Sequence, residues 1–414
     1  MRQILVIGGG PAGMMAACTA ASAGAAVTLL ERNAVCGVKL NITGKGRCNL
    51  TNHCAREELM RNIVTNGKFL YSAFSAMGPE DVMAYFSALG IPLKTERGNR
   101  VFPESDRAKD ISGALRTQMH RLGVAVIQGK ALEFLVSDGR ITDVTLQDGR
   151  RLGADAFILA AGGCSYPRTG SDGSGFQLAR TAGHTVTPVK PSLVPLLAEG
   201  DIPARLEGLS LRNVTFTVKK DGKTVFSEFG EMLFTDRGVS GPLVLSASSH
   251  LSSEKHTFPY RAEIDLKPAL DADTLDKRLL RDFSQSQNRD FSHSLSSLLP
   301  AKLIPVTVEL SGIVGTQKIN AVTRAQREGL CRLLKAFPLT LTGFAPWDQA
   351  IVTSGGVSVK EVDPKTMRSK KAENLYLAGE ILDVDAYTGG FNLQIAWSTG
   401  FCAGQAAAKG EKES

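Results

Sequence analysis

Three glycines near the N-terminus have the spacing of a phosphate-binding turn. Gly8, Gly10 and Gly13 form a G-x-G-x-x-G motif directly after a short apolar run. In such a motif the first glycine permits a tight turn from strand to helix, the second lets the backbone approach a pyrophosphate, and the third lets the helix pack on the strand. Pro11 suits the first helical position, and the N–H groups around Ala12 would face the phosphates at the positive end of the helix dipole. The spacing therefore predicts a nucleotide-binding turn.

The elements around this turn support a nucleotide. Residues 3–7 read as a buried strand, 11–23 as an alanine-rich helix, and 27–30 as a second strand. Glu31 ends that strand and is placed to accept hydrogen bonds from ribose hydroxyls, with Arg32 beside it. A bare glycine motif is also compatible with a structural turn, whereas the complete strand–helix–strand unit favours a nucleotide. The unit alone does not distinguish NAD from FAD.

Two later segments bear on that choice. Asp138-Gly139 and Asp148-Gly149 separate short β-type runs, which predicts a three-stranded meander, and the strand that follows ends before Ala161-Gly162. Residues 375–378 predict another buried strand, followed by Gly379-Glu380, then Gly389-Gly390 and a helix over 393–408. The N-terminus of that helix would stabilise negative charge at the N1/O2 edge of a flavin. Either motif alone is compatible with ordinary turn chemistry.

The three segments together resemble the FAD domains of the glutathione-reductase-like superfamily. The resemblance implies that Ala161-Gly162 lies near the nucleotide half of FAD and that Glu380 hydrogen-bonds the ribityl chain. Redox disulfides in that superfamily form from a C-x-x-x-x-C pair after the first βαβ unit. Cys36 and Cys48 do not have that spacing, so Cys48 is not expected to be a nucleophile.

A closer resemblance starts in the glycine-rich stretch 36–52. Lys39 to Asn49 reads K-L-x-x-T-G-x-G-R-C-N, and it resembles the signature of a three-domain bacterial flavoprotein family that includes aminoacetone oxidase and BaiN-type bile-acid-inducible reductases. Further matching stretches are RVFP at 100–103, GEMLFT at 230–235, GVSGP at 238–242, TSGGV at 353–357, GEILDVD at 379–385 and GGFNLQ at 389–394. The resemblance implies bound FAD and a redox enzyme, and it leaves the substrate open.

The candidate cofactor-binding residues come from these segments. They are Gly8, Gly10, Pro11, Ala12, Gly13, Glu31, Arg32, Lys39, Thr43, Gly44, Gly46, Arg47, Cys48, Asn49, Ala161, Gly162, Gly379, Glu380, Asp383, Gly390, Phe391, Asn392, Leu393 and Gln394. The family resemblance implies that the residues from Lys39 to Asn49 line the flavin side of the cofactor. Alternative interpretations are that Lys39 and Arg47 are solvated charges and that Cys48 fills a small buried space.

The 414 residues predict an α/β protein with a glutathione-reductase-like Rossmann domain interrupted by an insertion. Residues 1–190 with 345–414 would form the discontinuous FAD domain, and 191–268 with about 338–344 an inserted β-barrel-like domain or sandwich. Within the β domain, Asp221-Gly222 predicts a hairpin, and Gly238 to Pro242 continues the β-rich region. Residues 269–337 would form a helical subdomain, in which Pro300 and Pro305 break the chain into short helices and Thr323 and Gln326 have the spacing of a capping box. Topology and the resemblance favour a lid or wall over the flavin.

Composition excludes several classes of protein. With 43% hydrophobic and 21% charged residues the chain is not disordered, and seven cysteines without a C-x-x-C pair argue against a disulfide framework or a metal site and favour the cytoplasm. The uncharged stretch 4–30 resembles a membrane span, but glycines and Pro11 interrupt it, so no membrane attachment is expected. The net charge of +7 permits an anionic ligand without requiring nucleic acid, and no RNA-binding motif is visible.

These observations favour an FAD-dependent oxidoreductase that acts on a small organic substrate by hydride transfer to or from flavin N5. No second strand–G-x-G-x-x-G–helix unit is present, so NAD(P)H would bind only transiently as a co-substrate, and O2 is equally compatible as electron acceptor. Two alternatives stay open: an aminoacetone-like amine oxidase that produces peroxide, and an RNA-associated flavoprotein. No catalytic acid or base is identified, and the substrate and the oligomeric state are left open.

Overall fold

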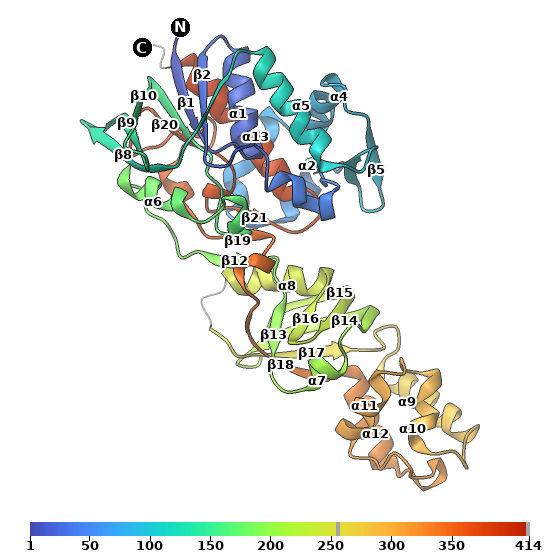
Figure 1. Cartoon of the computed structure of the whole chain (residues 1–414). Helices are drawn as coiled ribbons and strands as arrows, with labels where there is room; N and C mark the ends of the chain where they lie inside the picture. The colour runs from blue at the N-terminus through green and yellow to red at the C-terminus, as the bar shows by residue number, and fades with distance from the viewer. Residues whose placement is uncertain (254–256, 411–414) are drawn as a thin grey trace. The chain divides into compact units, whose positions relative to one another are not determined.

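The computed structural model describes residues 1–253 and 257–410 and divides the chain into two compact units (Figure 1). The first unit comprises Met1–Ser192 and Pro346–Ser414, and the second comprises Leu193–Ala345. The sequence analysis placed these breaks at 190/191 and 344/345. It also separated 269–337 as a subdomain, which stays a prediction because the contacts group that stretch with the barrel. Each unit has its own hydrophobic core.

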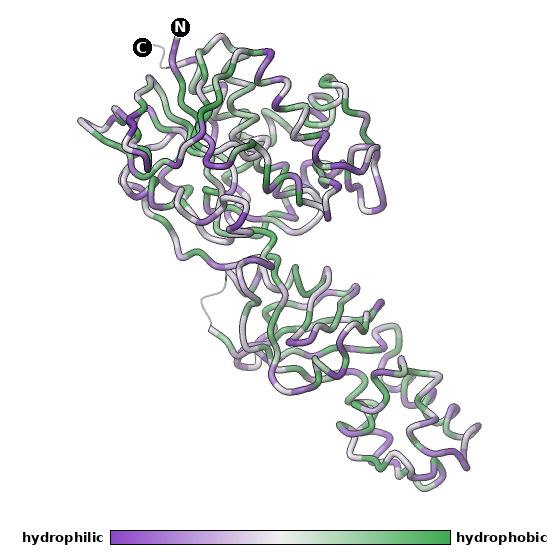
Figure 2. The backbone as a smooth tube through the Cα atoms, viewed as in Figure 1, coloured by the Kyte–Doolittle hydropathy of each residue, from purple (hydrophilic) through white to green (hydrophobic). Residues whose placement is uncertain are grey.

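A five-stranded parallel sheet with the order β20-β11-β1-β2-β7 lies at the centre of the first unit. Its strands are β1 Gln3–Ile7, β2 Ala26–Glu31, β7 Ala125–Gln128, β11 Ala156–Leu159 and β20 Leu375–Leu377. Figure 2 shows hydrophobic residues concentrated along this sheet, as expected for strands covered on both faces. Because parallel strands end at one edge, the loops after β1, β2, β11 and β20 meet there. The predicted Rossmann sheet is confirmed.

Two helices pack on each other through small residues. They are α1 Pro11–Ser22 and α13 Phe391–Lys409. A Cβ on Gly400 would lie 2.4 Å from the Ala12 oxygen, and one on Gly404 would lie 2.5 Å from the Ala16 oxygen. The sequence predicted the start of α13 at residue 393, and the helix starts two residues earlier because the left-handed Gly390 (φ +100°) is its N-cap. Across residues 1–253 and 257–410, no helix is both long and apolar enough to cross a bilayer.

Smaller elements surround the central sheet. The predicted meander is confirmed as β8 Ala131–Ser137, β9 Arg140–Leu146 and β10 Arg151–Gly153. Three short sheets complete this unit. In one, β6 Arg100–Pro103 lies between β3 Thr51–Asn52 and β5 Leu93–Glu96. In the other two, β4 Ile63–Thr65 pairs with β21 Asp385–Ala386, and β12 Lys190–Ser192 pairs with β19 Val352–Ser354. The sequence analysis assigned no element to the helices α2 Arg56–Arg61, α3 Tyr71–Ala76, α4 Pro79–Ala88, α5 Ala108–Arg121 and α6 Ser174–Thr181.

The second unit contains a closed barrel with the strand order β13-β16-β15-β14-β17-β18. Of the two predicted architectures, barrel and sandwich, the barrel is therefore confirmed. Its strands are β13 Leu196–Ala198, β14 Ser210–Lys220, β15 Lys223–Thr235, β16 Gly238–Ser240, β17 Tyr260–Asp265 and β18 Phe337–Phe344. The predicted hairpin turns at Asp221-Gly222, where both residues have positive φ. The remaining helices are α7 Ile202–Arg205, α8 Pro242–Ser253, α9 Ala272–Ser284, α10 Phe291–Ser294, α11 Leu303–Ser311 and α12 Arg324–Lys335.

Two expectations about the second unit were wrong in detail. Residues around Pro242 were assigned to a β-rich region, but Pro242 starts helix α8, where its missing N–H costs nothing. Pro300 and Pro305 were expected to break their segment into short helices, and α10 and α11 are short, but Pro305 lies inside the first turn of α11, where no intrahelical N–H bond is needed. The predicted capping box is confirmed, because Thr323 and Gln326 each bond the other's backbone N–H.

We predict that Gly13→Ala destabilises the first unit strongly. The new Cβ would lie 1.8 Å from the Gly8 oxygen, so α1 would have to move away from β1. Overpacking of this kind typically costs about 1–3 kcal/mol, measurable by thermal or urea unfolding. The matched control is Gly113→Ala in α5, whose Cβ would meet only Arg116 Nη2 at 3.9 Å. This control should gain up to about 1 kcal/mol from helix propensity; equal behaviour of the two variants would contradict the packing role of Gly13.

Candidate functional site

The turn between β1 and α1 combines close backbone packing with open space. Gly8 has φ +106° and its N–H donates to the Leu30 oxygen over 2.8 Å. A Cβ on Gly8 would lie 2.5 Å from the Ala160 oxygen, so both Gly8 and Gly13 are required by packing. A Cβ on Gly10, in contrast, would meet no atom within 4 Å. The structure therefore leaves room beside Gly10, where the sequence predicts a pyrophosphate.

Two helices start at this edge of the sheet, and no side chain caps the free N–H groups or neutralises the positive dipole end at either N-terminus. Neither α1 nor α13 has a side-chain cap or an acidic residue in its first turn. Pro11 is the first residue of α1, and Ala12 and Phe391 are buried. The free N–H groups and dipole ends of the two helices thus suit phosphate and the negative edge of a flavin.

Glu31 lies at the end of β2 and is buried, with 8% of its surface exposed. Its Oε2 accepts a hydrogen bond from Gly9 N over 2.7 Å. Its Oε1 accepts from Asn33 N over 2.7 Å and from Asn33 Nδ2 over 2.8 Å. These bonds orient the carboxylate and leave lone pairs for a further donor. The ribose contact of Glu31 stays a prediction.

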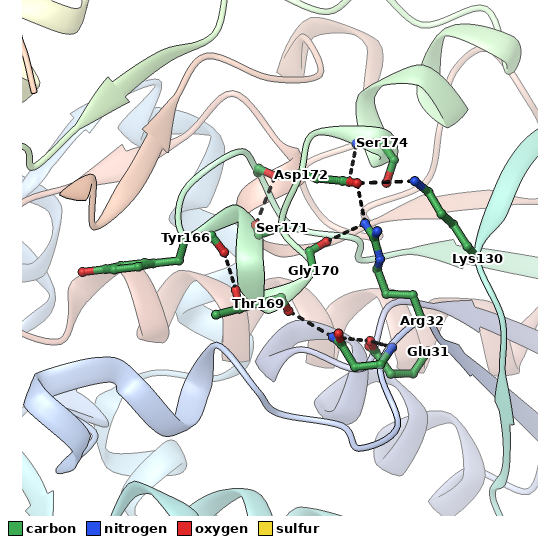
Figure 3. A network of polar contacts seen from close by, with 11 residues as sticks. Glu31, Arg32, Lys130, Tyr166, Thr169, Gly170, Ser171, Asp172 and Ser174 are labelled. Carbon is green, nitrogen blue, oxygen red and sulfur yellow. Dashed lines mark hydrogen bonds and ion pairs between the residues drawn. The ribbon is translucent and has the colours of Figure 1, made fainter. Parts of the chain in front are cut away.

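An ionic network ties the loop before α6 to the end of β2 (Figure 3). Arg32 Nη1 lies 2.6 Å from Asp172 Oδ2 and donates to the Gly170 oxygen over 3.2 Å. Lys130 Nζ lies 3.4 Å from the same Asp172 oxygen. Burial raises the pKa of Asp172, but hydrogen bonds and the Arg32 charge outweigh it and hold the pKa well below its ordinary value. Arg32, predicted as a cofactor residue, therefore positions this loop, and its partner Asp172 has no motif in the sequence.

Lys39 and Glu380 lie 341 positions apart and form an ion pair of 2.6 Å. Lys39 Nζ also donates to Ser165 Oγ over 2.6 Å, and Ser165 Oγ donates to Glu380 Oε1 over 3.0 Å. The Thr353 N–H donates to the same Glu380 oxygen over 2.8 Å. The network joins four stretches of the chain, so Lys39 is not a solvated charge. Sequence reasoning missed Ser165, and Thr353 belonged to a quoted motif without an assigned role.

Arg47 is held by two carboxylates and an aromatic ring. Its guanidinium bonds Glu96 and Asp106, with Nε 2.8 Å from Asp106 Oδ1, and it lies 4.1 Å from the centroid of the Phe102 ring. The hydrogen bond from Arg47 lowers the pKa of Glu96, and those from Lys94 and Arg47 lower the pKa of Asp106. Arg47 therefore fixes the loop around it as a partly exposed, ion-paired charge, and its place beside the flavin stays a prediction.

The rest of this loop has an unusual backbone. Gly44, Lys45 and Gly46 have φ values of +56°, +58° and +84°. Thr43 Oγ1 donates to the Leu40 oxygen over 2.7 Å. A Cβ on Gly44 would lie 2.9 Å from the backbone nitrogen of Asn49, whereas a Cβ on Gly46 would meet no atom within 4 Å. Gly46, like Gly10, leaves space that a ligand can fill.

Cys48 is fully buried and has φ +60°. Burial raises the pKa of the Cys48 thiol to about 12, so it remains protonated at neutral pH and is a poor nucleophile. Asn49 follows it, and its Oδ1 is buried without a hydrogen-bond partner among the described residues. A buried acceptor without a donor lowers the free energy of unfolding by about 1–3 kcal/mol. A hydrogen-bond donor on a bound group would remove this cost at Asn49.

The segment after β20 contacts both the glycine turn at the start of α1 and the stretch that follows the loop 39–49. Gly379 has φ +77°, and a Cβ there would lie 2.7 Å from the Ala12 side chain. Gly390 approaches the backbone of Thr51, where a Cβ would lie 2.5 Å from the carbonyl oxygen. The structure thus brings together the three stretches that the sequence analysis selected. Ala161 and Gly162 join them, because a Cβ on Gly8 would lie 2.9 Å from Ala161 Cα.

Side chains at the start of α13 bond the protein itself. Asn392 Nδ2 donates to the Ala386 oxygen over 2.8 Å, and its Oδ1 accepts from Ala386 N over 3.0 Å. Gln394 is fully buried, and its Nε2 donates to the Met77 oxygen over 2.9 Å. Leu393 is half-buried. These side chains shape the turn before the helix, and a cofactor would meet the backbone here.

Asp385 is a buried acid that sequence reasoning did not select, although it lies in a quoted motif. Its side chain is 1% exposed, Ser192 Oγ donates to its Oδ2 over 3.0 Å, and its Oδ1 has no partner among the described residues. Burial raises the pKa of Asp385 to about 6, and the charges of Asp383 and Glu380 add to the effect. The predicted site residue Asp383 is near it, and burial also raises the pKa of Asp383.

The residues fit FAD. Open space at Gly10 and Gly46, two uncapped helix N-termini and the orphaned Asn49 oxygen lie on the three stretches that converge at one edge of the sheet. No group of three or more His, Cys, Asp or Glu side chains in the described ranges could hold a metal ion.

Known proteins resemble the chain over its whole length. A family profile described as "HI0933-like protein Rossmann domain" matches residues 2–406. A 3-dehydro-bile acid delta(4,6)-reductase of Clostridium scindens is 35% identical over 99% of this chain and 100% of that protein. Ribosomal RNA dihydrouridine synthases of Haemophilus influenzae and Escherichia coli are 29% and 28% identical, covering 96% and 97% of this chain and 97% and 96% of theirs.

Two solved structures share the fold at low identity. A 3-ketosteroid delta1-dehydrogenase from Sterolibacterium denitrificans has a TM-score of 0.53 at 12% identity, covering 99% of this chain and 100% of that chain. A 3-ketosteroid-delta4-(5alpha)-dehydrogenase from Rhodococcus jostii has a TM-score of 0.51 at 15% identity, covering 99% and 97%. The predicted fold class is confirmed.

We predict that Gly10→Val yields a folded but colourless protein. The space beside Gly10 accommodates the side chain when no ligand is present, whereas the pyrophosphate of FAD would need the same space. Flavin content per protein, read from the visible absorption, should fall by at least tenfold, while the far-UV circular dichroism should match the wild type. A variant that retains full flavin content would contradict the predicted position of the pyrophosphate.

We predict that Asp385→Asn becomes more stable relative to the wild type as pH rises. Because the folded pKa of about 6 exceeds the ordinary 3.8, the favourable contribution of Asp385 is complete below about pH 4 and is lost as pH rises through 6. The difference in free energy of unfolding should shift toward the variant by up to about 3 kcal/mol between pH 4 and 7. Asp138→Asn, at an exposed turn, controls for the loss of one carboxyl group. A difference that does not change with pH would contradict the role of burial.

Proposed function

The chain belongs to the HI0933-like family of FAD-dependent oxidoreductases, and on this premise we propose that it reduces a carbon–carbon double bond conjugated to a carbonyl group in a small organic substrate. The observation that carries the proposal is the full-length similarity, at 35% identity, to the 3-dehydro-bile acid delta(4,6)-reductase. The names of the dihydrouridine synthases also denote reduction of a ring double bond next to a carbonyl. The relatives named thus share one type of reducible group.

Residues on three stretches would hold FAD. The N–H groups around Gly10 and Ala12 would bind the pyrophosphate, Glu31 the adenosine ribose, and Asn49 with the N-terminus of α13 the flavin ring. FAD supplies the two-electron chemistry when it is bound. The protein contributes a fixed position for the ring and a positive environment for charge that develops on it.

Lys39 is the side chain best placed to supply that charge. Two of its three N–H donors bond Glu380 and Ser165, both at 2.6 Å, and 21% of the side chain is exposed. The remaining N–H can reach a ligand without breaking the network. We therefore assign Lys39 to the stabilisation of negative charge on the flavin or on the carbonyl oxygen of the substrate.

A second candidate substrate is uridine in ribosomal RNA. The observation in its favour is the pair of relatives with that name, which match 96% and 97% of this chain. Uracil carries the same conjugated double bond as an enone, so the chemistry required of the protein is the same.

We predict that NADH or NADPH bleaches the purified yellow protein under anaerobic conditions and that a 4-ene-3-ketosteroid then restores the colour, because the double bond accepts the electrons. Lys39→Met should retain FAD but lower the reoxidation rate by about 100-fold, the size typical of a lost charge-stabilising donor. Lys109→Met, an exposed position on α5, is the matched control.

Two outcomes of this experiment decide between substrates and between reactions. Dihydrouridine in treated ribosomal RNA, detected by mass spectrometry, with no turnover of the steroid, would select the second substrate. An absence of bleaching, combined with peroxide from an amine in air, would contradict a reductase.

A further inference from the structure

The first unit contains a pocket that none of the predicted cofactor residues lines. It has a volume of about 520 Å³ and is formed by α2, by the turn at 67–70 and by the start of α3. Its lining residues are Arg56, Glu57, Met60, Arg61, Gly67, Lys68 and Tyr71. Pockets for small ligands typically have about 300–1,000 Å³, so one nucleotide would fit.

The charge of the pocket is positive. Arg56, Arg61 and Lys68 stand against the single carboxylate of Glu57. Arg61 is paired with Glu58 at 3.4 Å, in an exposed ion pair of little strength. The side chains of Arg56 and Lys68 form no ion pair or hydrogen bond within residues 1–253 and 257–410, and both residues are exposed. The pocket therefore has two free cations suited to an anion.

An aromatic ring completes this pocket. Tyr71 is the first residue of α3 and is 52% exposed, which is high for a large aromatic side chain. Exposed aromatic rings beside basic residues are the usual platform for stacking a nucleic-acid base. Cations that bind phosphate, combined with a ring that stacks on a base, favour a phosphorylated nucleoside over a ligand that carries only a carboxylate.

The pocket is connected to the predicted flavin edge by a short strand. β4 Ile63–Thr65 runs between α2 and the turn at 67–70 and pairs with β21, where Asp385 lies opposite Thr65. Asn66 Nδ2 donates to the backbone carbonyl oxygen of Asp383 over 2.8 Å. The walls of the pocket and the segment that leads into α13 are therefore parts of one hydrogen-bonded structure.

We propose that this pocket binds the phosphate of a nucleoside phosphate, with Arg56 and Lys68 on the phosphate and Tyr71 against the base. Two ligands carry this group. One is NADPH, whose 2′-phosphate distinguishes it from NADH, and the other is single-stranded RNA. The choice between them rests on the proposed function, because the first is an electron donor and the second a substrate.

The test measures binding to the FAD-loaded full-length protein and requires no catalysis. The probes are NADPH and NADH in calorimetry and a fluorescein-labelled single-stranded RNA decamer in anisotropy. Arg56→Ala/Lys68→Ala removes both free cations, and Tyr71→Ser removes the ring. Lys109→Ala/Arg121→Ala removes the same charge from two exposed positions on α5 outside the pocket. Flavin content and melting temperature verify folding, and Arg56→Gln/Lys68→Gln replaces the alanine pair if that pair misfolds.

The pocket variant should bind its ligand at least tenfold more weakly than the wild type, whereas the α5 variant should bind within twofold. Tyr71→Ser should weaken binding by about tenfold, within the range for loss of one stacked base. If NADPH is the ligand, the wild type prefers it to NADH and the pocket variant loses the preference. If RNA is the ligand, the magnitude of the slope of log affinity against log salt falls by about 1.4 in the pocket variant, about 0.7 for each cation removed.

The proposal is overturned if the wild type binds neither probe, or if the pocket and α5 variants lose affinity equally. A protein that binds a probe through this pocket but reduces no conjugated double bond would leave the pocket assignment standing and contradict the proposed function instead.

Discussion

The site depends on the approach of backbones to a distance that only glycine permits. Helix α1 is in contact with β1 through Gly13, whose Cβ would lie 1.8 Å from the Gly8 oxygen, and with α13 through Gly400, whose Cβ would lie 2.4 Å from the Ala12 oxygen. These contacts fix the N-terminus of α1 against a strand on one side and the last helix on the other. Glycine makes up 42 of 414 residues, against a usual share of about 7%, and part of this excess lies at positions where stretches remote in sequence meet.

Once the backbones are fixed, polar side chains determine where the loops lie. The loops after β2, after β11 and after β20 contain little regular structure, so few backbone hydrogen bonds hold them. Arg32 with Asp172, Lys39 with Glu380, and Arg47 with Glu96 and Asp106 each join a loop to a distant part of the chain. Each ion pair is partly exposed and weak by itself. Their contribution is positional: they hold three loops at the edge of the sheet while the helix N-termini remain uncapped.

Features encoded locally could be predicted from the sequence, and features that depend on distant partners could not. The βαβ unit, the meander, the barrel hairpin and the capping box at Thr323 follow from periodicity and turn residues within short stretches, and the structure contains all of them. The partners of Arg47 lie 49 and 59 positions away and belong to no motif. Helix α8 was missed because its first residue, Pro242, was assigned to the β-rich stretch before it, and no periodicity was recognised in the residues that follow. Asp385 likewise accepts a hydrogen bond from Ser192, which lies 193 positions away.

The way in which the cofactor site is built bears on where substrate specificity resides. Most of its predicted contacts with FAD are made by backbone groups, at Gly10, Gly46 and the N-termini of α1 and α13, because Asn392 and Gln394 use their side chains on the protein itself. A site made of backbone groups changes little when surrounding side chains are replaced, so one such site can serve relatives named for a bile acid and for ribosomal RNA. On the proposed arrangement, discrimination between substrates would come from side chains outside it. In the first unit the free cations and exposed ring on residues 56–71 are side chains of that kind, and β4 connects them to the segment that leads into α13.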